Sequence, residues 1–169
     1  MVRGRTAASQ FLVPEQEILS RESILEESWT IIQLGKAGEN ILQWLARRRL
    51  IMNMYTCENC NSPCGLTTRG DVTDEKLWNC KHCKRSKSVR YRSFFERSHI
   101  SLLNIILIIY CWSRDMSQNN IMHESSVSSR TTVIDWCNFC REVWDVWLEQ
   151  NSTDKKNTFV HFLAAIALN

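Results

Sequence analysis

Four of the eight cysteines in the chain form two Cys-x-x-Cys pairs: Cys57 with Cys60, and Cys80 with Cys83. Structural zinc sites take four thiolate or imidazole ligands in a tetrahedron, and the tight turn of such a pair lets both of its sulfur atoms reach one ion. Residues 61–79 separate the two pairs, which is a spacing typical of zinc ribbons. The sequence therefore predicts that these four cysteines bind one Zn²⁺ ion; free thiols or disulfides are the alternative.

The other cysteines and one histidine need a separate interpretation. Cys64 follows the first pair and His82 lies inside the second, so each is an alternative ligand, but neither preserves the arrangement of two pairs. Cys137 and Cys140 resemble a third pair, yet helical periodicity places them on one face together with Val133, Trp144 and Trp147. We expect both of them, and Cys111 in its apolar run, to be buried in the hydrophobic core.

Positive charge is concentrated directly after the second cysteine pair. Between residues 81 and 97 the single acid Glu96 stands against Lys81, Lys84, Arg85, Lys87, Arg90, Arg92 and Arg97. Part of this charge would offset the negative charge of four thiolates around a divalent ion. The alternation around Val89 also predicts a half-buried strand with a basic outer surface. We expect a DNA phosphate backbone to contact Lys81, Lys84, Arg85, Lys87, Arg90 and Arg92.

The N-terminal third of the chain predicts a small helical unit. Residues 1–16 are unpatterned and are expected to form a flexible lead-in. In residues 17–53 apolar positions recur at helical spacing on both sides of Gly35 and Gly38, which predicts a pair of helices, the first over residues 17 to 34. The basic run Arg47–Arg49 is expected to be a solvated face rather than a nucleic-acid contact.

The rest of the chain predicts a ribbon, a helical unit and a tail. Repeated turn residues in 54–95 predict a zinc ribbon with a hairpin between Leu66 and Trp78. Helical periodicity returns in residues 96–149. Residues 150–169 form a C-terminal tail, whose apolar part we expect to pack on the body as a short helix. The predicted fold class is therefore mostly α-helical with a small β zinc ribbon.

Three helices with short polar joints in residues 96–149 predict a helix-turn-helix. The third helix is expected to begin at Ser128 or Ser129 and to bury Cys137. Its first turns would then enter a groove of DNA through the side chains of Ser128, Ser129, Arg130, Thr131 and Thr132. Acidic residues from Glu142 onward would repel the phosphate backbone. Only the first turns of the helix would therefore enter the DNA groove. An ordinary amphipathic helix in a bundle is the alternative.

Composition and charge exclude several classes of protein. The chain has 169 residues and a formal net charge of +3, which suits one or two small modules rather than a large enzyme. The N-terminus has no apolar signal core, and the longest apolar run, residues 105–112, is far shorter than the roughly 20 residues that span a bilayer. We expect a reducing compartment, nuclear in a eukaryote and otherwise cytoplasmic, with no membrane contact. The sequence offers no nucleophile–base pair and no set of carboxylates that would predict an enzyme.

The order of the motifs resembles that of a known family. Resemblance to the N-terminal DNA-binding region of Merlin-type transposases and their bacterial insertion-sequence relatives spans about residues 44–148, in the stretches CENCNSP, LWNCKHCKRSKSVRYRSFFERSHISLLNIILIIYCWSRDMS and VSSRTTVIDWCNFCREV. It implies the same four zinc ligands, a basic-to-aromatic passage over 85–95 and a recognition helix over 128–147. In that family an RNase H-like nuclease domain with three metal-binding carboxylates follows. The tail here is too short for such a domain, so we expect no transposition chemistry.

Together the motifs predict a zinc-dependent, non-catalytic DNA-binding protein derived from a transposase. Double-stranded DNA is the expected partner, and a second copy of the chain or a transposase is a candidate protein partner. No small-molecule substrate is expected. The residues leave two alternatives open: a protein-interaction adaptor built on the ribbon, and a protein that binds RNA or single strands.

Overall fold

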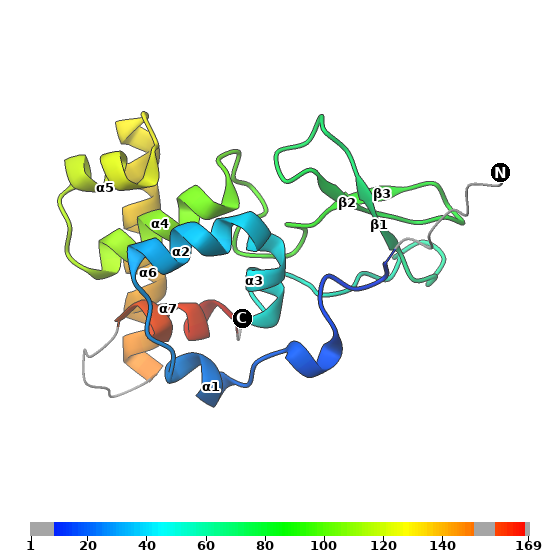
Figure 1. The fold of residues 1–169 in the computed structure, drawn as a ribbon, viewed down its shortest axis with the longest axis horizontal. Helices are drawn as coiled ribbons and strands as arrows, with labels where there is room; N and C mark the ends of the chain where they lie inside the picture. The colour runs from blue at the N-terminus through cyan, green and yellow to red at the C-terminus, as the bar shows by residue number, and fades with distance from the viewer. Residues whose placement is uncertain (1–8, 151–157, 168–169) are drawn as a thin grey trace.

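The computed structural model describes residues 9–150 and 158–167 and shows a mostly helical chain with one small antiparallel sheet (Figure 1). The strands are β1 Gly65–Thr68, β2 Lys76–Asn79 and β3 Ser86–Ser88. The helices are α1 Arg21–Leu25, α2 Ile31–Ala37, α3 Ile41–Arg47, α4 Leu102–Ser113, α5 Gln118–Ser125, α6 Arg130–Gln150 and α7 Thr158–Ala167, with the short 3₁₀ helices η1 Glu15–Glu17 and η2 Gly38–Asn40. About half of the chain is thus helical, and the predicted predominance of helix over one small sheet is confirmed.

The N-terminal helices are shorter and more numerous than the predicted pair. The expected first helix over residues 17–34 is broken into α1 and α2. The Ser20 hydroxyl caps α1 by accepting a hydrogen bond from the backbone N–H of Ser23 at 3.2 Å, and Thr30 forms a capping box with Gln33 at the start of α2. Each cap provides a hydrogen-bond acceptor for free backbone N–H groups at the start of a helix. A new helix therefore begins after Thr30, although apolar residues continue at helical spacing across the break.

Arg48 is buried beneath these helices, so the expectation that Arg47–Arg49 is a solvated face is wrong for Arg48, while Arg49 is exposed and Arg47 is half-buried. Its guanidinium carbon lies 4.8 Å from the ring centre of Trp29 and 4.0 Å from that of Trp44. Its Nε donates to a carboxylate oxygen of Glu27 at 2.8 Å. Burial lowers the pKa of the Arg48 guanidinium, and the two rings and the carboxylate compensate for the lost water.

Part of the predicted lead-in contacts the body through Leu12 and Val13, although most of residues 9–16 are exposed; residues 1–8 lie outside the described part of the chain. Val13 is buried in the main hydrophobic core. The Asn53 side chain accepts a hydrogen bond from the backbone N–H of Val13 and donates to its carbonyl, both at 2.9 Å. One polar side chain thus pairs both backbone groups of a distant residue and holds the segment in place.

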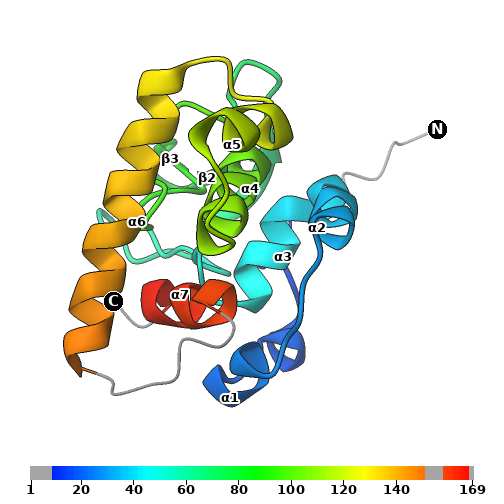
Figure 2. The ribbon, with the colours of Figure 1, turned by 90° about the vertical axis from the view of Figure 1, so that its left-hand side faces the viewer.

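Helix α4 is the centre of the molecule, and most of its side chains are buried. One side packs with α5 and α6 around a cluster that contains Ile108, Cys111, Ile121, Val127, Val133 and Cys137. The other side packs with α2 and α7, and Figure 2 shows α6 running beside α4 and α5. Three helices are therefore present in residues 96–149, as predicted. Ser101 and Ser117 begin the first two because their hydroxyls accept hydrogen bonds from backbone N–H groups of α4 and α5.

The C-terminal helix α7 belongs to the main core, which confirms the expectation that the apolar part of the tail packs on the body. Its Phe162 ring lies 6.0 Å from that of Phe94 and 5.5 Å from that of Trp112, centre to centre. Helix α7 also contacts α1, α4 and α6, so the two ends of the chain share one core. Residues 151–157 and 168–169 of the predicted tail lie outside the described residues.

The sheet brings the two cysteine pairs together. Strands β1 and β2 form the predicted hairpin with Leu66 opposite Trp78, and β3 pairs antiparallel with β2. Gly65 pairs with Asn79, so the segments just before β1 and just after β2 meet at the open end of the hairpin. The strand predicted from the alternation around Val89 is wrong, because β3 ends before it and residues 89–92 form a turn.

Candidate metal centre and basic surface

The four cysteines of the two pairs lie together at the open end of the hairpin. Their Sγ atoms all lie within 4.8 Å of one another, and those of Cys60 and Cys80 are 3.5 Å apart. Sulfur atoms in a tetrahedron with Zn–S bonds of about 2.3 Å are about 3.8 Å apart, so this spacing fits a zinc ion at the centre. Cys57 and Cys80 are buried, whereas Cys60 and Cys83 are half-buried. The prediction that these cysteines form one site able to hold a metal ion is confirmed.

The two cysteine pairs have the same backbone geometry. The N–H of Cys57 and that of Cys80 each donate to the carbonyl five residues later, at 2.9 and 2.8 Å. The residue after each pair has a positive φ, 54° at Asn61 and 58° at Lys84, and its N–H donates back to the carbonyl of the first cysteine, at 2.8 and 2.9 Å. Non-glycine residues seldom adopt this left-handed conformation. Two turns of the same geometry in unrelated stretches of sequence fit a site that holds one metal ion between them.

Neighbouring groups donate hydrogen bonds to these sulfur atoms; the Asn59 donor lowers the pKa of the Cys83 thiol, but the contact with the Cys60 thiol and burial raise it to about 11 overall. The Asn59 side-chain amide donates to Cys83 Sγ at 3.2 Å, and the backbone N–H of Cys83 donates to Cys80 Sγ at 3.3 Å. A hydrogen bond with Ser62 is the main reason that the pKa of the Cys60 thiol is lowered to about 6. Such donors offset the excess negative charge of about two that four thiolates leave around a divalent ion.

The remaining four cysteines are buried in hydrophobic clusters and are not members of the metal-binding group. Burial raises the pKa of the Cys64 and Cys111 thiols to about 11, and it also raises the pKa of Cys137 and Cys140. The predicted place of Cys111, Cys137 and Cys140 in the core is therefore confirmed, and Cys64 is buried beside the metal-binding group without belonging to it. His82 is exposed and also lies outside the group.

Five of the six predicted phosphate contacts of the ribbon are exposed or half-buried, and we call them the basic ribbon surface: Lys81, Lys84, Arg85, Lys87 and Arg92. The Lys87 ammonium lies 4.0 Å from the centre of the Tyr91 ring. The Arg92 guanidinium lies 3.0 Å from a carboxylate oxygen of Glu58, inside the first cysteine pair. Tyr91 and Glu58 thus order this surface, and no motif in the sequence singles out either residue.

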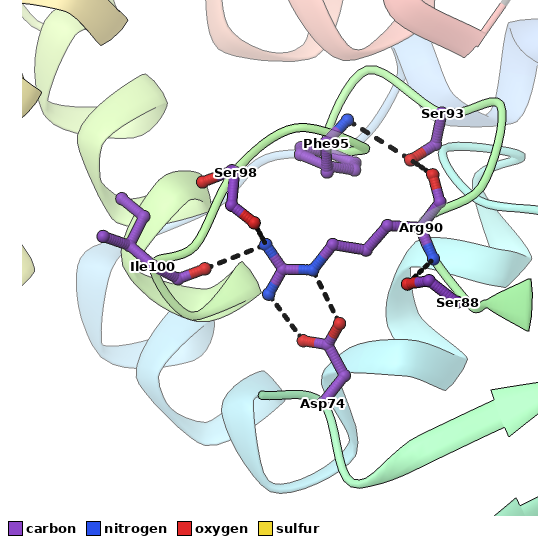
Figure 3. A network of polar contacts seen from close by, with 7 residues as sticks. All are labelled: Asp74, Ser88, Arg90, Ser93, Phe95, Ser98 and Ile100. Carbon is purple, nitrogen blue, oxygen red and sulfur yellow. Dashed lines mark hydrogen bonds and ion pairs between the residues drawn. The ribbon is translucent and has the colours of Figure 1, made fainter. Parts of the chain in front are cut away.

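Arg90 does not belong to the basic ribbon surface, since it is only 3% exposed. Its Nε and Nη2 donate to the two carboxylate oxygens of Asp74, each at 2.6 Å, and its Nη1 donates to the carbonyls of Ser98 and Ile100 at 3.0 and 2.9 Å (Figure 3). The expectation that Arg90 contacts a phosphate backbone is wrong. The strand ends at Ser88, and the turn that follows carries the guanidinium inward.

The residues predicted to read DNA lie at the start of α6, where Ser128, Ser129, Arg130 and Thr131 are exposed and Thr132 is half-buried. The Ser129 hydroxyl accepts a hydrogen bond from the backbone N–H of Thr132 at 3.3 Å and so caps the helix. The Arg130 guanidinium donates to the side chain of Gln118 in α5 at 3.3 Å. Ser128, Arg130 and Thr131 are therefore the exposed members of this set whose side chains do not cap the helix.

Within residues 9–150 and 158–167, no helix combines the length and apolar character needed to cross a membrane. No protein-family model, no curated protein and no solved structure matches this chain. The resemblance to transposases therefore stays a prediction, and the site is interpreted from its own geometry.

Proposed function

We propose that this chain is a zinc-dependent, non-catalytic protein that binds double-stranded DNA, with the ribbon holding the phosphate backbone. The observation that carries the proposal is the position of Lys81, Lys84 and Arg85, which are exposed on the turn that contains Cys80 and Cys83. An ion that shapes this turn also sets the spacing of its basic side chains. Binding to phosphates would therefore depend on the metal, and it would weaken with salt as counterions compete.

Two features of the basic ribbon surface suit a phosphate backbone. The backbone N–H of Lys84 donates a hydrogen bond to the Cys80 carbonyl and so fixes the backbone of the turn. The basic side chains on this turn therefore start from fixed backbone positions. The ion pair between Arg92 and Glu58 is largely exposed, and such pairs contribute at most about 1 kcal/mol. A phosphate can therefore displace the Glu58 carboxylate at a small cost in free energy. The Arg92 guanidinium would then donate two hydrogen bonds to that phosphate.

Helices α4, α5 and α6 are proposed to act as a helix-turn-helix. The turn between α5 and α6 is short: Ser126 ends α5 with a φ of 55°, and Val127 is buried beside Ile121 and Val133. An apolar residue that anchors such a turn holds the two helices at a constant angle. The start of α6, with Thr131 exposed, is the part proposed to enter a DNA groove.

The ribbon and the start of α6 lie toward opposite ends of the long axis of the molecule (Figure 1). A duplex that contacts both would run along the length of the protein. In this arrangement the ribbon supplies affinity that is independent of base sequence, and α6 supplies sequence preference. The resemblance to Merlin-type transposases supports this function, because there a zinc ribbon and a helix-turn-helix bind DNA; for this chain the proposal extends to binding alone.

Charge reversal with a matched control tests the proposal. The double variant Lys81→Glu with Arg85→Glu should bind a labelled duplex at least about tenfold more weakly than the natural chain at about 50 mM salt, as measured by fluorescence anisotropy. The control is Arg21→Glu with Lys36→Glu, which makes the same change of charge at exposed positions of α1 and α2. Equal loss in both variants, or tighter binding of single strands than of duplex, would contradict the proposal.

A further inference from the structure

We propose that one side of α6 is a docking site for a basic amphipathic helix of another protein. Trp136, Phe139, Val143 and Val146 recur at helical spacing beside the face that α6 buries in its own core, and we call them the α6 stripe. Phe139 is 42% exposed and Val146 is 53% exposed, while the other two are half-buried. Large apolar side chains that line up in this way on a surface are typical of interaction sites.

A groove of about 580 Å³ lies beside the first half of the α6 stripe. Asp135, Trp136 and Phe139 form one wall, and the other wall consists of Ser93, Phe94, Glu96, Arg97 and Ser98, in which the charges of Glu96 and Arg97 offset each other. Phe94 comes from the second wall and stacks on Phe139, with ring centres 4.7 Å apart. The groove therefore has an aromatic lining that suits one apolar side chain of a partner, and the exposed Val146 extends the contact along the helix.

A row of carboxylates runs beside the α6 stripe. Asp135, Glu142 and Glu149 are exposed and stand seven residues apart, so they repeat along one line at intervals of about 10 Å. Two of them directly precede the stripe residues Trp136 and Val143 in sequence. In paired helices, residues at this position face the flank of the partner helix. If the apolar side of a partner helix packs on the α6 stripe, the side chains on the flank of that helix would therefore lie next to these carboxylates.

The charge of this row identifies the occupant. A second copy that packed antiparallel would set its own Asp135, Glu142 and Glu149 against the same three carboxylates, and like charges at this distance repel. Phosphates of a nucleic acid would be repelled for the same reason. A helix with lysine or arginine along its flank gains ion pairs instead, and the 3–4 spacing of the α6 stripe matches the ridges of a packed helix. This surface is separate from the basic ribbon surface, and Phe139 and Val146 lie on α6 beyond the start that is proposed to enter a DNA groove, so the inference does not rest on DNA binding.

Two designed peptides probe the surface. Both are helical peptides of about 21 residues with leucine at the 3–4 spacing, and they differ only in carrying lysine or glutamate along the flank. With the full, zinc-loaded chain at low salt, the lysine peptide should bind at least about tenfold more tightly than the glutamate peptide. Val146→Lys, at an exposed position, should weaken binding of the lysine peptide at least about fivefold. The double variant Glu142→Lys with Glu149→Lys should reverse the preference between the peptides.

Ile32→Lys is the matched control, because Ile32 is a single apolar side chain, 70% exposed, on α2. It should leave peptide binding unchanged, and circular dichroism should show the same fold for every variant. Equal binding of the two peptides, no binding of either, or equal effects of Val146→Lys and Ile32→Lys would each overturn the proposal. A dimer in sedimentation equilibrium that Val146→Lys converts to a monomer would assign the α6 stripe to a second copy and would also overturn it.

Discussion

The guanidinium of Arg90 and the carboxylate of Asp74 form a bidentate ion pair with both N···O distances at 2.6 Å. Asp74 lies in the loop between β1 and β2, and Arg90 follows β3. The carbonyls of Ser98 and Ile100, which Arg90 also binds, come just before α4. Since the two charged side chains are only 4% and 10% exposed, water does not compete for them. The pair therefore joins the ribbon to the helical body.

Removal of Arg90 should destabilise the protein strongly. Arg90→Met leaves the Asp74 carboxylate buried without its guanidinium, and breaking a buried pair in this way costs about 3–5 kcal/mol of unfolding free energy. Arg92→Met, at an exposed position, should cost less than about 1 kcal/mol but should weaken DNA binding. Urea unfolding and anisotropy measure the two quantities. A loss of DNA binding without a loss of stability in Arg90→Met would contradict the account and would place Arg90 on the DNA-binding surface.

Replacement of single cysteines should separate ligands from core residues. Cys80→Ser should lose bound zinc and the circular dichroism of the ribbon, because a structural site of this kind folds around its ion. Cys64→Ser should retain one zinc per chain, since Cys64 lies outside the group of four. Elemental analysis of the purified proteins gives the zinc content. Zinc retained in Cys80→Ser together with zinc lost from Cys64→Ser would show that the ligands are assigned wrongly.

The buried thiols should make the protein less stable at alkaline pH. Burial raises the pKa of Cys64 and Cys111 from 9.0 to about 11. As the pH rises through this window, the unfolded chain releases these protons before the folded chain does, so the free energy of unfolding falls. Urea midpoints at about pH 8, 9 and 10 should therefore decrease in that order. Midpoints that stay constant or rise would contradict the raised pKa values.

The same thiols should resist alkylation in the folded protein. With a pKa of about 11, about one Cys64 thiol in a thousand is a thiolate at pH 8, and only the thiolate reacts. Iodoacetamide should modify Cys64 and Cys111 slowly until denaturant is added, as mass spectrometry of the digested protein can show. Rapid modification of either cysteine in the native protein would mean that it is accessible.

Two glycines in the N-terminal helices should respond oppositely to alanine. A Cβ at Gly35 in α2 meets no atom within 4 Å, so Gly35→Ala should stabilise the protein by about 0.5–1 kcal/mol through helix propensity. A Cβ at Gly38 in η2 would lie 2.5 Å from a methyl carbon of Leu103 in α4, so the Leu103 side chain would have to move and Gly38→Ala should destabilise by about 1 kcal/mol. Thermal unfolding of both variants checks the signs. A stabilising Gly38→Ala would mean that α2 and α4 pack less closely.

Features that depend on nearby residues could be predicted from the sequence. The cysteine pairs are local turns, so their spacing alone predicted which four sulfur atoms meet. The starts of α5 and α6 follow from Ser117 and Ser129, whose hydroxyls bond to backbone N–H groups three residues away. The core-facing side of α6 follows from apolar periodicity, which places Cys137 and Cys140 inward.

Features that depend on distant partners could not be predicted in this way. The alternation around Arg90 was typical of a strand, but the turn is held by Asp74, 16 residues away. Residues 9–16 carry no apolar pattern, and their order comes from Asn53, 40 residues from Val13. The break before α2 follows from the Thr30 capping box, which apolar spacing alone does not reveal. Hydrogen bonds of single polar side chains thus account for each of these differences.

Titration of a duplex of about 25 base pairs with the zinc-loaded chain and with the chelator-treated chain tests the central claim most directly. The account predicts a complex only with the zinc-loaded chain. Its affinity should fall with salt at a logarithmic slope of about −4.5, since each of the five residues of the basic ribbon surface that neutralises a phosphate contributes about −0.9. Equal affinity of the two forms would contradict the account, and so would the absence of any complex at low salt.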